Sequence, residues 1–145
     1  MTTTWIVAAD PTLGRVIEIE DDAPAEVRRF ARPEPTNPAH EAHPPAANVF
    51  ETFDGERRAH KVEPESDETQ RMAFTREIGN YVEHARRDRR FEKLVLVADA
   101  RVLANLRKQL SGETMKLVAN EVSKNLARHN IEQIRGYLAP YLSLQ

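Results

Sequence analysis

The apolar residues of the chain are most concentrated in residues 91–110, around an uninterrupted Leu-Val-Leu-Val-Ala run at positions 94–98. A short run without polar gaps is typical of a β-strand that is buried on both faces. Beyond Asp99, apolar residues return at helical spacing, at Val102, Leu103, Leu106 and Leu110. Asp99 can accept hydrogen bonds from the free backbone N–H groups at the start of that helix. The pattern therefore predicts a strand-turn-helix unit of an α/β domain.

The start of the chain is predicted to form short strands. Residues 4–9 are almost entirely apolar, and Asp10 with Pro11 ends this first strand. Residues 15–20 form a second strand, and the short link between the two predicts an antiparallel hairpin. Residues 26–31 fit a third strand or a helical turn, and we expect the strand.

Helical periodicity marks residues 67–90 as the longest helix. Its apolar face is formed by Phe74, Ile78, Tyr81, Val82 and Ala85. Gly79 lies in the middle of this helix, where a glycine is destabilising relative to alanine by about 1 kcal/mol. A close approach of the helix to a strand would explain this glycine.

The last third of the chain is predicted to contain a strand and a helix. Ser111 and Gly112 break the chain, and residues 115–122 read as another strand. Asn130 and Gln133 resemble a capping box ahead of an amphipathic helix. Pro140 is expected to end or kink this helix, because it lacks a backbone N–H.

Residues 32–48 differ from the rest, because they hold five of the nine prolines and almost no large apolar side chain. Such a segment buries too little surface to offset its ordering entropy, so we expect a flexible loop inside the domain. Residues 49–52 are a strand candidate, and residues 56–63 an edge strand or a loop. The element order predicts one α/β domain over residues 1–145, with a mixed sheet that starts antiparallel, finishes parallel and is flanked by helices.

The composition is that of an ordinary soluble domain, with 30% charged residues and a net charge of -2. It argues against a mainly electrostatic nucleic-acid binder, although a local basic patch remains compatible with it. The absence of cysteine rules out a disulfide framework and suits a reducing compartment. No apolar run approaches the roughly 20 residues of a membrane span, and the first residues do not resemble a signal peptide. We therefore expect a cytoplasmic protein that does not enter the membrane.

Asp10 and Asp99 are the residues best placed for metal chemistry, because each follows a buried strand. If those strands are parallel neighbours, both carboxylates lie at one end of the sheet and could hold Mg²⁺ for phosphodiester hydrolysis. A turn at Asp10 and a helix cap at Asp99 are the commoner roles for such residues, and we favour them. The chain has no glycine-rich phosphate loop and no nucleophile motif, so we expect no cofactor and no enzymatic activity.

Basic residues gather in two places, which together could form a phosphate-contacting patch. The first cluster contains Arg57, Arg58 and Lys61. The second closes the long helix and consists of Arg86, Arg87, Arg89 and Arg90. Acidic residues are interleaved with both clusters, so a solvated surface without a ligand is the simpler interpretation.

Several short motifs carry a family resemblance. They are the opening W-I-V-A-A-D, G-x-R-x-A-x-x-x-E-P from Gly55, F-T-R-E-I, R-F-E-K-L-V-L-V-A, L-R-K-Q-L and E-V-S-K-N-L. In this order and spacing the chain resembles the bacterial host attachment proteins, which are described as required for attachment to host cells. The resemblance spans nearly the whole chain apart from the proline-rich segment.

That family is in turn similar to the middle domain of archaeal and eukaryotic peptide-release factors, which implies a ribonuclease-H-like α/β fold. Release activity there depends on a Gly-Gly-Gln tripeptide, which this chain lacks. The family often has Pro-Pro where this chain has Asp99 and Ala100, and K-D-L-T where it has Lys-Asn-Leu-Ala at positions 124–127. The resemblance therefore supplies no catalytic residue.

Three hypotheses follow. The first is a non-enzymatic host attachment protein that binds a macromolecular partner, such as another protein. The second is a ribosome- or RNA-binding factor without peptide-release activity, which would use the two arginine clusters. The third is a metal-dependent nuclease built on Asp10 and Asp99.

Overall fold

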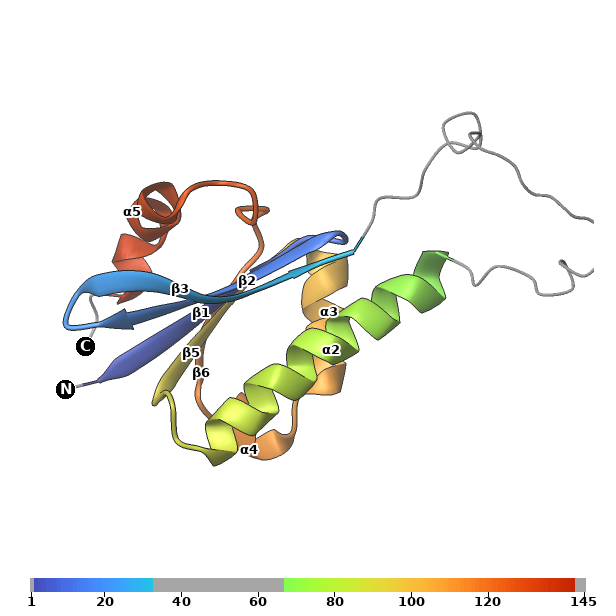
Figure 1. Ribbon diagram of the computed structural model, residues 1–145, viewed down its shortest axis with the longest axis horizontal. Coiled ribbons are helices and arrows are strands. Elements are labelled where there is room, and N and C mark those ends of the chain that lie inside the picture. The colour runs from blue at the N-terminus through green and yellow to red at the C-terminus, as the bar shows by residue number, and fades with distance from the viewer. Residues whose placement is uncertain (1, 33–66, 143–145) are drawn as a thin grey trace, which may run out of the picture. The chain divides into compact units, whose positions relative to one another are not determined.

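The computed structural model describes residues 2–32 and 67–142 of the 145-residue chain. These residues contain a five-stranded sheet in the order β3-β2-β1-β5-β6. The strands are β1 (Thr3–Ala9), β2 (Leu13–Glu20), β3 (Ala23–Ala31), β5 (Lys93–Val97) and β6 (Val118–Val122). The helices are α2 (Asp67–Arg87), α3 (Ala100–Gln109), α4 (Gly112–Met115) and α5 (Ile131–Leu142). The sheet and the helices that cover it form one compact unit, from which residues 67–70 are excluded (Figure 1).

Strand β1 lies at the centre of the sheet. It is antiparallel to β2, with Ile6 opposite Ile17, and parallel to β5, with Ile6 beside Val95. β2 pairs with β3 in antiparallel fashion, and β5 pairs with β6 in parallel. The predicted mixed sheet, with an antiparallel start and a parallel finish, is therefore confirmed. The hairpin of β1 and β2 and the strand at residues 26–31 are confirmed with it.

The sheet separates two hydrophobic cores. Trp5, Val7 and Ala9 of β1 lie in one core, which α2 and α3 cover, whereas Ile6 and Ala8 lie in the other, which α5 covers. This division follows from the alternation of side chains along a strand. Figure 1 shows α5 on the opposite side of the sheet from α2 and α3. Burial on both faces explains why the central strands are apolar throughout.

The long helix ends at Arg87, earlier than the predicted end at Arg90. Arg89 adopts a left-handed conformation with φ of 58°, and the backbone N–H of Arg90 donates to the carbonyl of Ala85 at 2.9 Å. This turn reverses the chain toward β5, and the helical pattern of the sequence does not reveal it. Gly79 approaches a helix and not a strand, because a Cβ at this position would lie 2.7 Å from Cβ of Gln109 in α3.

The predicted strand over residues 115–122 is wrong at its beginning. Residues Gly112–Met115 form the short helix α4, and β6 begins only at Val118. The Ser111 hydroxyl caps this helix by accepting from the backbone N–H of Thr114 at 3.2 Å. Ser111 therefore starts a helix at a position where a break in the chain was predicted.

Both caps predicted for the later helices are confirmed. The Asp99 carboxylate accepts from the backbone N–H of Val102 at 3.0 Å. Asn130 and Gln133 bond each other's backbone N–H groups reciprocally, at 2.8 and 3.0 Å. Pro140 does not end the last helix, which continues to Leu142. A proline this close to the C-terminus removes only one hydrogen bond, to a residue that solvent can reach.

The proline-rich segment beyond Arg32 and the possible strands at residues 49–52 and 56–63 lie outside the described residues. The single domain over residues 1–145 and its flexible loop therefore stay predictions.

Candidate partner-binding surface

The arginines at the end of α2 have different roles in the structure. Arg86 is half-buried, and its Nε donates to Oγ1 of Thr114 at 2.9 Å. Its Nη2 lies 3.4 Å from Oε1 of Glu83 on the preceding turn. Arg86 therefore ties α2 to α4 through its Nε and Nη2.

Glu83 is the centre of this connection between helices. Its carboxylate accepts from the backbone N–H of Ser111 at 2.6 Å and from the Ser111 hydroxyl at 3.0 Å. Burial raises the pKa of the Glu83 carboxyl, but the hydrogen bonds from Ser111, Thr114 and Arg86 outweigh it. The net pKa is lowered, so Glu83 is ionised at neutral pH.

Arg87, Arg89 and Arg90 are exposed, and Lys108 of α3 is exposed as well. Within residues 2–32 and 67–142 none of these four side chains forms an ion pair with a carboxylate. Arg90 instead lies over the ring of Trp5, with its guanidinium carbon 5.2 Å from the ring centroid. We call these four residues the basic surface.

Six other arginines in the described part of the chain differ from the basic surface because they form ion pairs. Ion pairs with carboxylates engage Arg15, Arg29, Arg86, Arg107, Arg128 and Arg135. The basic surface therefore consists of cations that form no ion pair within the described part of the chain.

Two adjoining hollows accompany the basic surface. One, of about 560 Å³, is lined by Arg87, Lys108 and the carboxylate of Glu83. The other, of about 260 Å³, is lined by Tyr81, Arg90 and the carboxylate of Asp88. Asn80 and His84 of α2 line both. The basic surface thus places cations beside two hollows, an arrangement that suits contact with an acidic group of a larger molecule.

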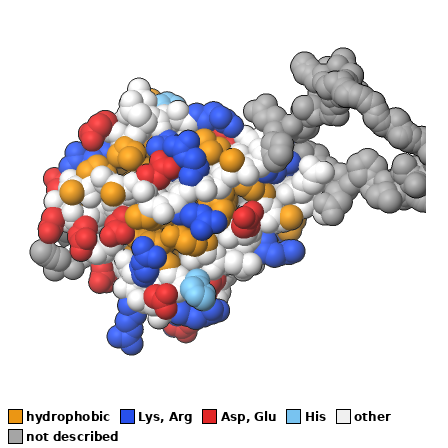
Figure 2. Space-filling model, in the orientation of Figure 1, with side chains coloured by type: hydrophobic (Ala, Val, Ile, Leu, Met, Phe, Trp, Pro, Cys, Tyr) orange, Lys and Arg blue, Asp and Glu red, His pale blue; other side chains and the backbone are white. Residues whose placement is uncertain are grey.

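The surface charge around it is mixed. Figure 2 shows Lys and Arg side chains interspersed with Asp and Glu over the face that α2 crosses. This distribution agrees with the net charge of -2 and gives no continuous basic stripe on that face. Arg57, Arg58 and Lys61 of the other predicted cluster lie outside the described residues.

Asp10 and Asp99 lie at the same end of the sheet, because β1 and β5 are parallel neighbours. Asp10 is buried, and its Oδ1 accepts from the backbone N–H groups of Thr12 at 2.8 Å and Leu13 at 2.7 Å. Its Oδ2 accepts from Nε of Arg128 at 3.1 Å. With Asp99 capping α3, both carboxylates serve the turn and cap roles that we favoured.

Metal-binding groups are also sparse around these carboxylates. In the described ranges no group of three or more His, Cys, Asp and Glu side chains is arranged to hold a metal ion. The same ranges contain no helix that is both long and apolar enough to cross a membrane.

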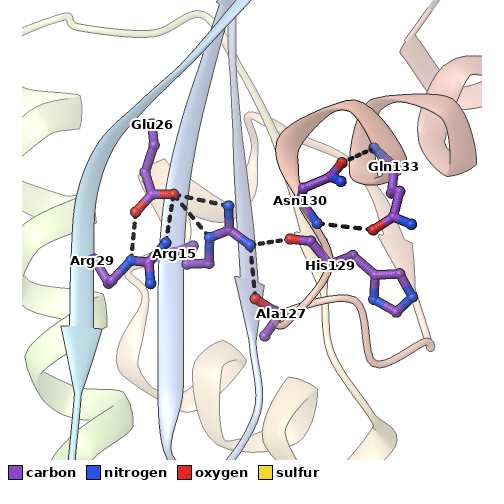
Figure 3. Close-up of polar contacts among 7 residues, drawn as sticks. All are labelled: Arg15, Glu26, Arg29, Ala127, His129, Asn130 and Gln133. Carbon is purple, nitrogen blue, oxygen red and sulfur yellow. Dashed lines mark hydrogen bonds and ion pairs between the residues drawn. The ribbon is translucent and has the colours of Figure 1, made fainter.

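The role of Arg15 was not predicted from the sequence, in which it is only the first residue of an expected strand. Arg15 is 5% exposed, and its Nε donates to Glu26 at 2.9 Å. Its Nη1 donates to the carbonyl of Ala127 at 2.9 Å and to that of His129 (Figure 3). Arg15 thereby attaches the connection between β6 and α5 to the sheet. A basic residue inside an otherwise apolar strand was the signal that could have revealed it.

Comparisons with known proteins agree with this architecture. Residues 5–138 match a family model described as "Protein required for attachment to host cells". A search of curated proteins gives no match. Among solved structures, a chain described as an archaeal protein matches with a TM-score of 0.52 at 6% sequence identity. The match covers 94% of this chain and 32% of that chain, so this chain spans about a third of its length. At this identity the likeness concerns the fold alone.

Proposed function

The chain belongs to the family of proteins required for attachment to host cells, and we propose that it acts without catalysis, by binding a macromolecular partner through the basic surface. One observation carries this proposal. Arg87, Arg90 and Lys108 line two adjoining hollows. Like Arg89, which lies between Arg87 and Arg90 in the sequence, they form no ion pair with a carboxylate in the described ranges. Cations that form no ion pair and lie beside surface hollows favour an acidic partner through electrostatic complementarity.

The helix dipoles explain the positions of some of these cations but not of all of them. Arg87 lies in the last turn of α2 and Lys108 in the last turn of α3, where cations complement the helix dipole. Arg89 and Arg90 follow the end of α2. Complementing the dipole of α2 therefore does not explain the positions of these two arginines.

A ribosome- or RNA-binding factor is the second candidate. The mixed α/β sheet supports the expected similarity to the ribonuclease-H-like middle domain of release factors, and the basic surface supports contact with phosphates. In the described part of the chain the exposed aromatic side chains are Tyr137 and Tyr141 of α5, across the sheet from the basic surface, which speaks against base stacking beside that surface. We do not propose a nuclease, because Asp10 and Asp99 already accept hydrogen bonds from the protein.

The experiment uses two triple variants of the full chain. One combines Arg87→Ala, Arg89→Ala and Lys108→Ala. The control combines Arg76→Ala, Lys116→Ala and Lys124→Ala, which removes the same charge from exposed positions elsewhere.

Each protein is immobilised and incubated with a lysate of the organism that encodes it. The incubations are carried out at low and moderate salt, with and without ribonuclease. We expect one or more partners that the wild type and the control retain, that salt weakens, and that the first variant loses. Partners that resist ribonuclease would support the first candidate, and loss of ribosomes on ribonuclease treatment would support the second. Identical capture by both variants would overturn the role of the basic surface.

A further inference from the structure

An open hollow of about 650 Å³ lies beside Arg15, where β2 and β3 meet the connection before α5. Arg15 is paired with Ala8 across the sheet, and Ala8 belongs to the core that α5 covers. The hollow is therefore on the opposite side of the sheet from the basic surface. It is independent of the function proposed above.

Three arginines from separate segments line this hollow. Arg15 comes from β2, Arg29 from β3, and Arg128 from the connection. Two carboxylates, Glu26 and Glu132, line it as well. The charged lining thus carries an excess of one positive charge, and the hollow has the volume of a small-molecule site.

Glu26 is shared between two of the arginines. Its Oε1 lies 2.9 Å from Nη2 of Arg15, and its Oε2 lies 2.8 Å from Nε of Arg29 (Figure 3). The hydrogen bond from Arg29 lowers the pKa of Glu26, burial opposes this, and Arg15 adds to the lowering. Glu26 therefore stays ionised and holds Arg15 and Arg29 side by side on one face of the sheet.

Arg29 and Arg128 also reach solvent, with 56% and 57% of their side chains exposed. Arg29 uses Nε and Nη2 on Glu26, while no hydrogen bond to Nη1 occurs within the described ranges. Arg128 is oriented by Asp10 and by the Thr12 hydroxyl, at 3.1 and 2.5 Å. Planar guanidinium groups fixed in this way suit the oxygens of a carboxylate or a phosphate.

We propose that this hollow binds a small organic molecule through its carboxylate or phosphate group. Arg29 binds the oxyanion through Nη1, and Arg128 lines the same hollow and adds positive charge to it. Arg15 is a positioning residue, because it holds the carbonyls of Ala127 and His129 and thereby places Arg128 at the hollow. Glu26 keeps Arg29 in place.

The test measures binding of sodium pyrophosphate and of sodium citrate to the full chain by isothermal titration calorimetry. Sodium chloride at matched ionic strength serves as the blank. We expect saturable binding of at least one probe and a loss of affinity of at least tenfold in Arg29→Gln. The matched control is Arg76→Gln on α2, an exposed arginine on the other side of the sheet, which should bind as the wild type does.

Binding of pyrophosphate alone would identify a phosphate ligand, and binding of citrate alone a carboxylate ligand. No saturable binding of either probe, or equal affinity in wild type and Arg29→Gln, would overturn the proposal. Neither result bears on the basic surface, because that surface lies across the sheet.

Discussion

The carboxylate of Glu83 accepts a 2.6 Å hydrogen bond from the backbone N–H of Ser111, across 28 residues of sequence. This bond joins the last turns of α2 to the start of α4. It also explains why Arg86, which contacts Glu83 and Thr114, differs from the arginines that follow it. Because Arg86 belongs to this connection, the basic surface begins one residue later, at Arg87.

Replacing Glu83 with glutamine is expected to lower the free energy of unfolding by about 1.5–3 kcal/mol, because a charged hydrogen-bond acceptor is lost. The pKa of Glu83 is lowered in the folded state from its usual 4.5. Its contribution is therefore fully present above pH 4.5 and is lost as pH falls through the folded-state pKa. Urea unfolding at neutral pH and in acid measures both effects.

We expect the difference between wild type and Glu83→Gln to shrink in acid. The exposed Glu77→Gln on the same helix is the control, with an expected change below about 0.5 kcal/mol. A constant difference between wild type and Glu83→Gln at all pH values would contradict the assignment.

Replacing Arg15 with methionine is expected to lower the free energy of unfolding by about 3–5 kcal/mol. The substitution leaves the carboxylate of Glu26 with one arginine and removes the donor of the Ala127 and His129 carbonyls. Amide hydrogen exchange should also accelerate in residues 126–130, since this connection loses its attachment to the sheet.

Arg29→Gln is the control for Arg15→Met. Its guanidinium bonds the same Glu26 but is largely exposed, so we expect a change of about 1 kcal/mol or less. Equal destabilisation by the two variants would show that burial of Arg15 has no special effect.

Two glycine-to-alanine substitutions are expected to have opposite effects. Gly79→Ala places a Cβ 2.7 Å from Cβ of Gln109, so α2 and α3 must move apart, and we expect destabilisation by about 1–3 kcal/mol. Gly136→Ala in α5 meets no atom within 4 Å, and alanine's higher helix propensity should stabilise by up to about 1 kcal/mol. Thermal unfolding of both variants checks the signs, and stabilisation by Gly79→Ala would refute the close packing of the helices.

Substitution of Arg90 with methionine is expected to change the fluorescence of Trp5, the single tryptophan of the chain. The Arg90 guanidinium lies 5.2 Å from the centroid of this buried ring. Removing its charge should alter the emission spectrum and lower the free energy of unfolding by about 0.5–1 kcal/mol. Arg87→Met is the control and should leave the spectrum unchanged, because no contact between Arg87 and Trp5 occurs in the described ranges. Unaltered Trp5 emission in Arg90→Met would contradict the contact.

The candidate site was predictable only in part. Arg87, Arg89 and Arg90 stand out in the sequence as a run of cations, but so does Arg86, whose guanidinium is committed to Thr114. Lys108 joins the basic surface from a different helix, and nothing in its own neighbourhood indicates this. Availability to a partner depends on which carboxylates lie nearby in space, and the sequence order does not contain that information.

The sequence by itself determined the features that depend on near neighbours. The apolar run at residues 94–98 specified a strand buried on both faces, and Asp99 with the pair Asn130 and Gln133 specified two helix starts. Only the tertiary structure decided the roles of Arg15 and Glu83. Their partners lie 112 and 28 residues away in sequence, at Ala127 and Ser111. A cap is satisfied within one helical turn, whereas a buried charge is satisfied only when folding brings a distant donor or acceptor to it.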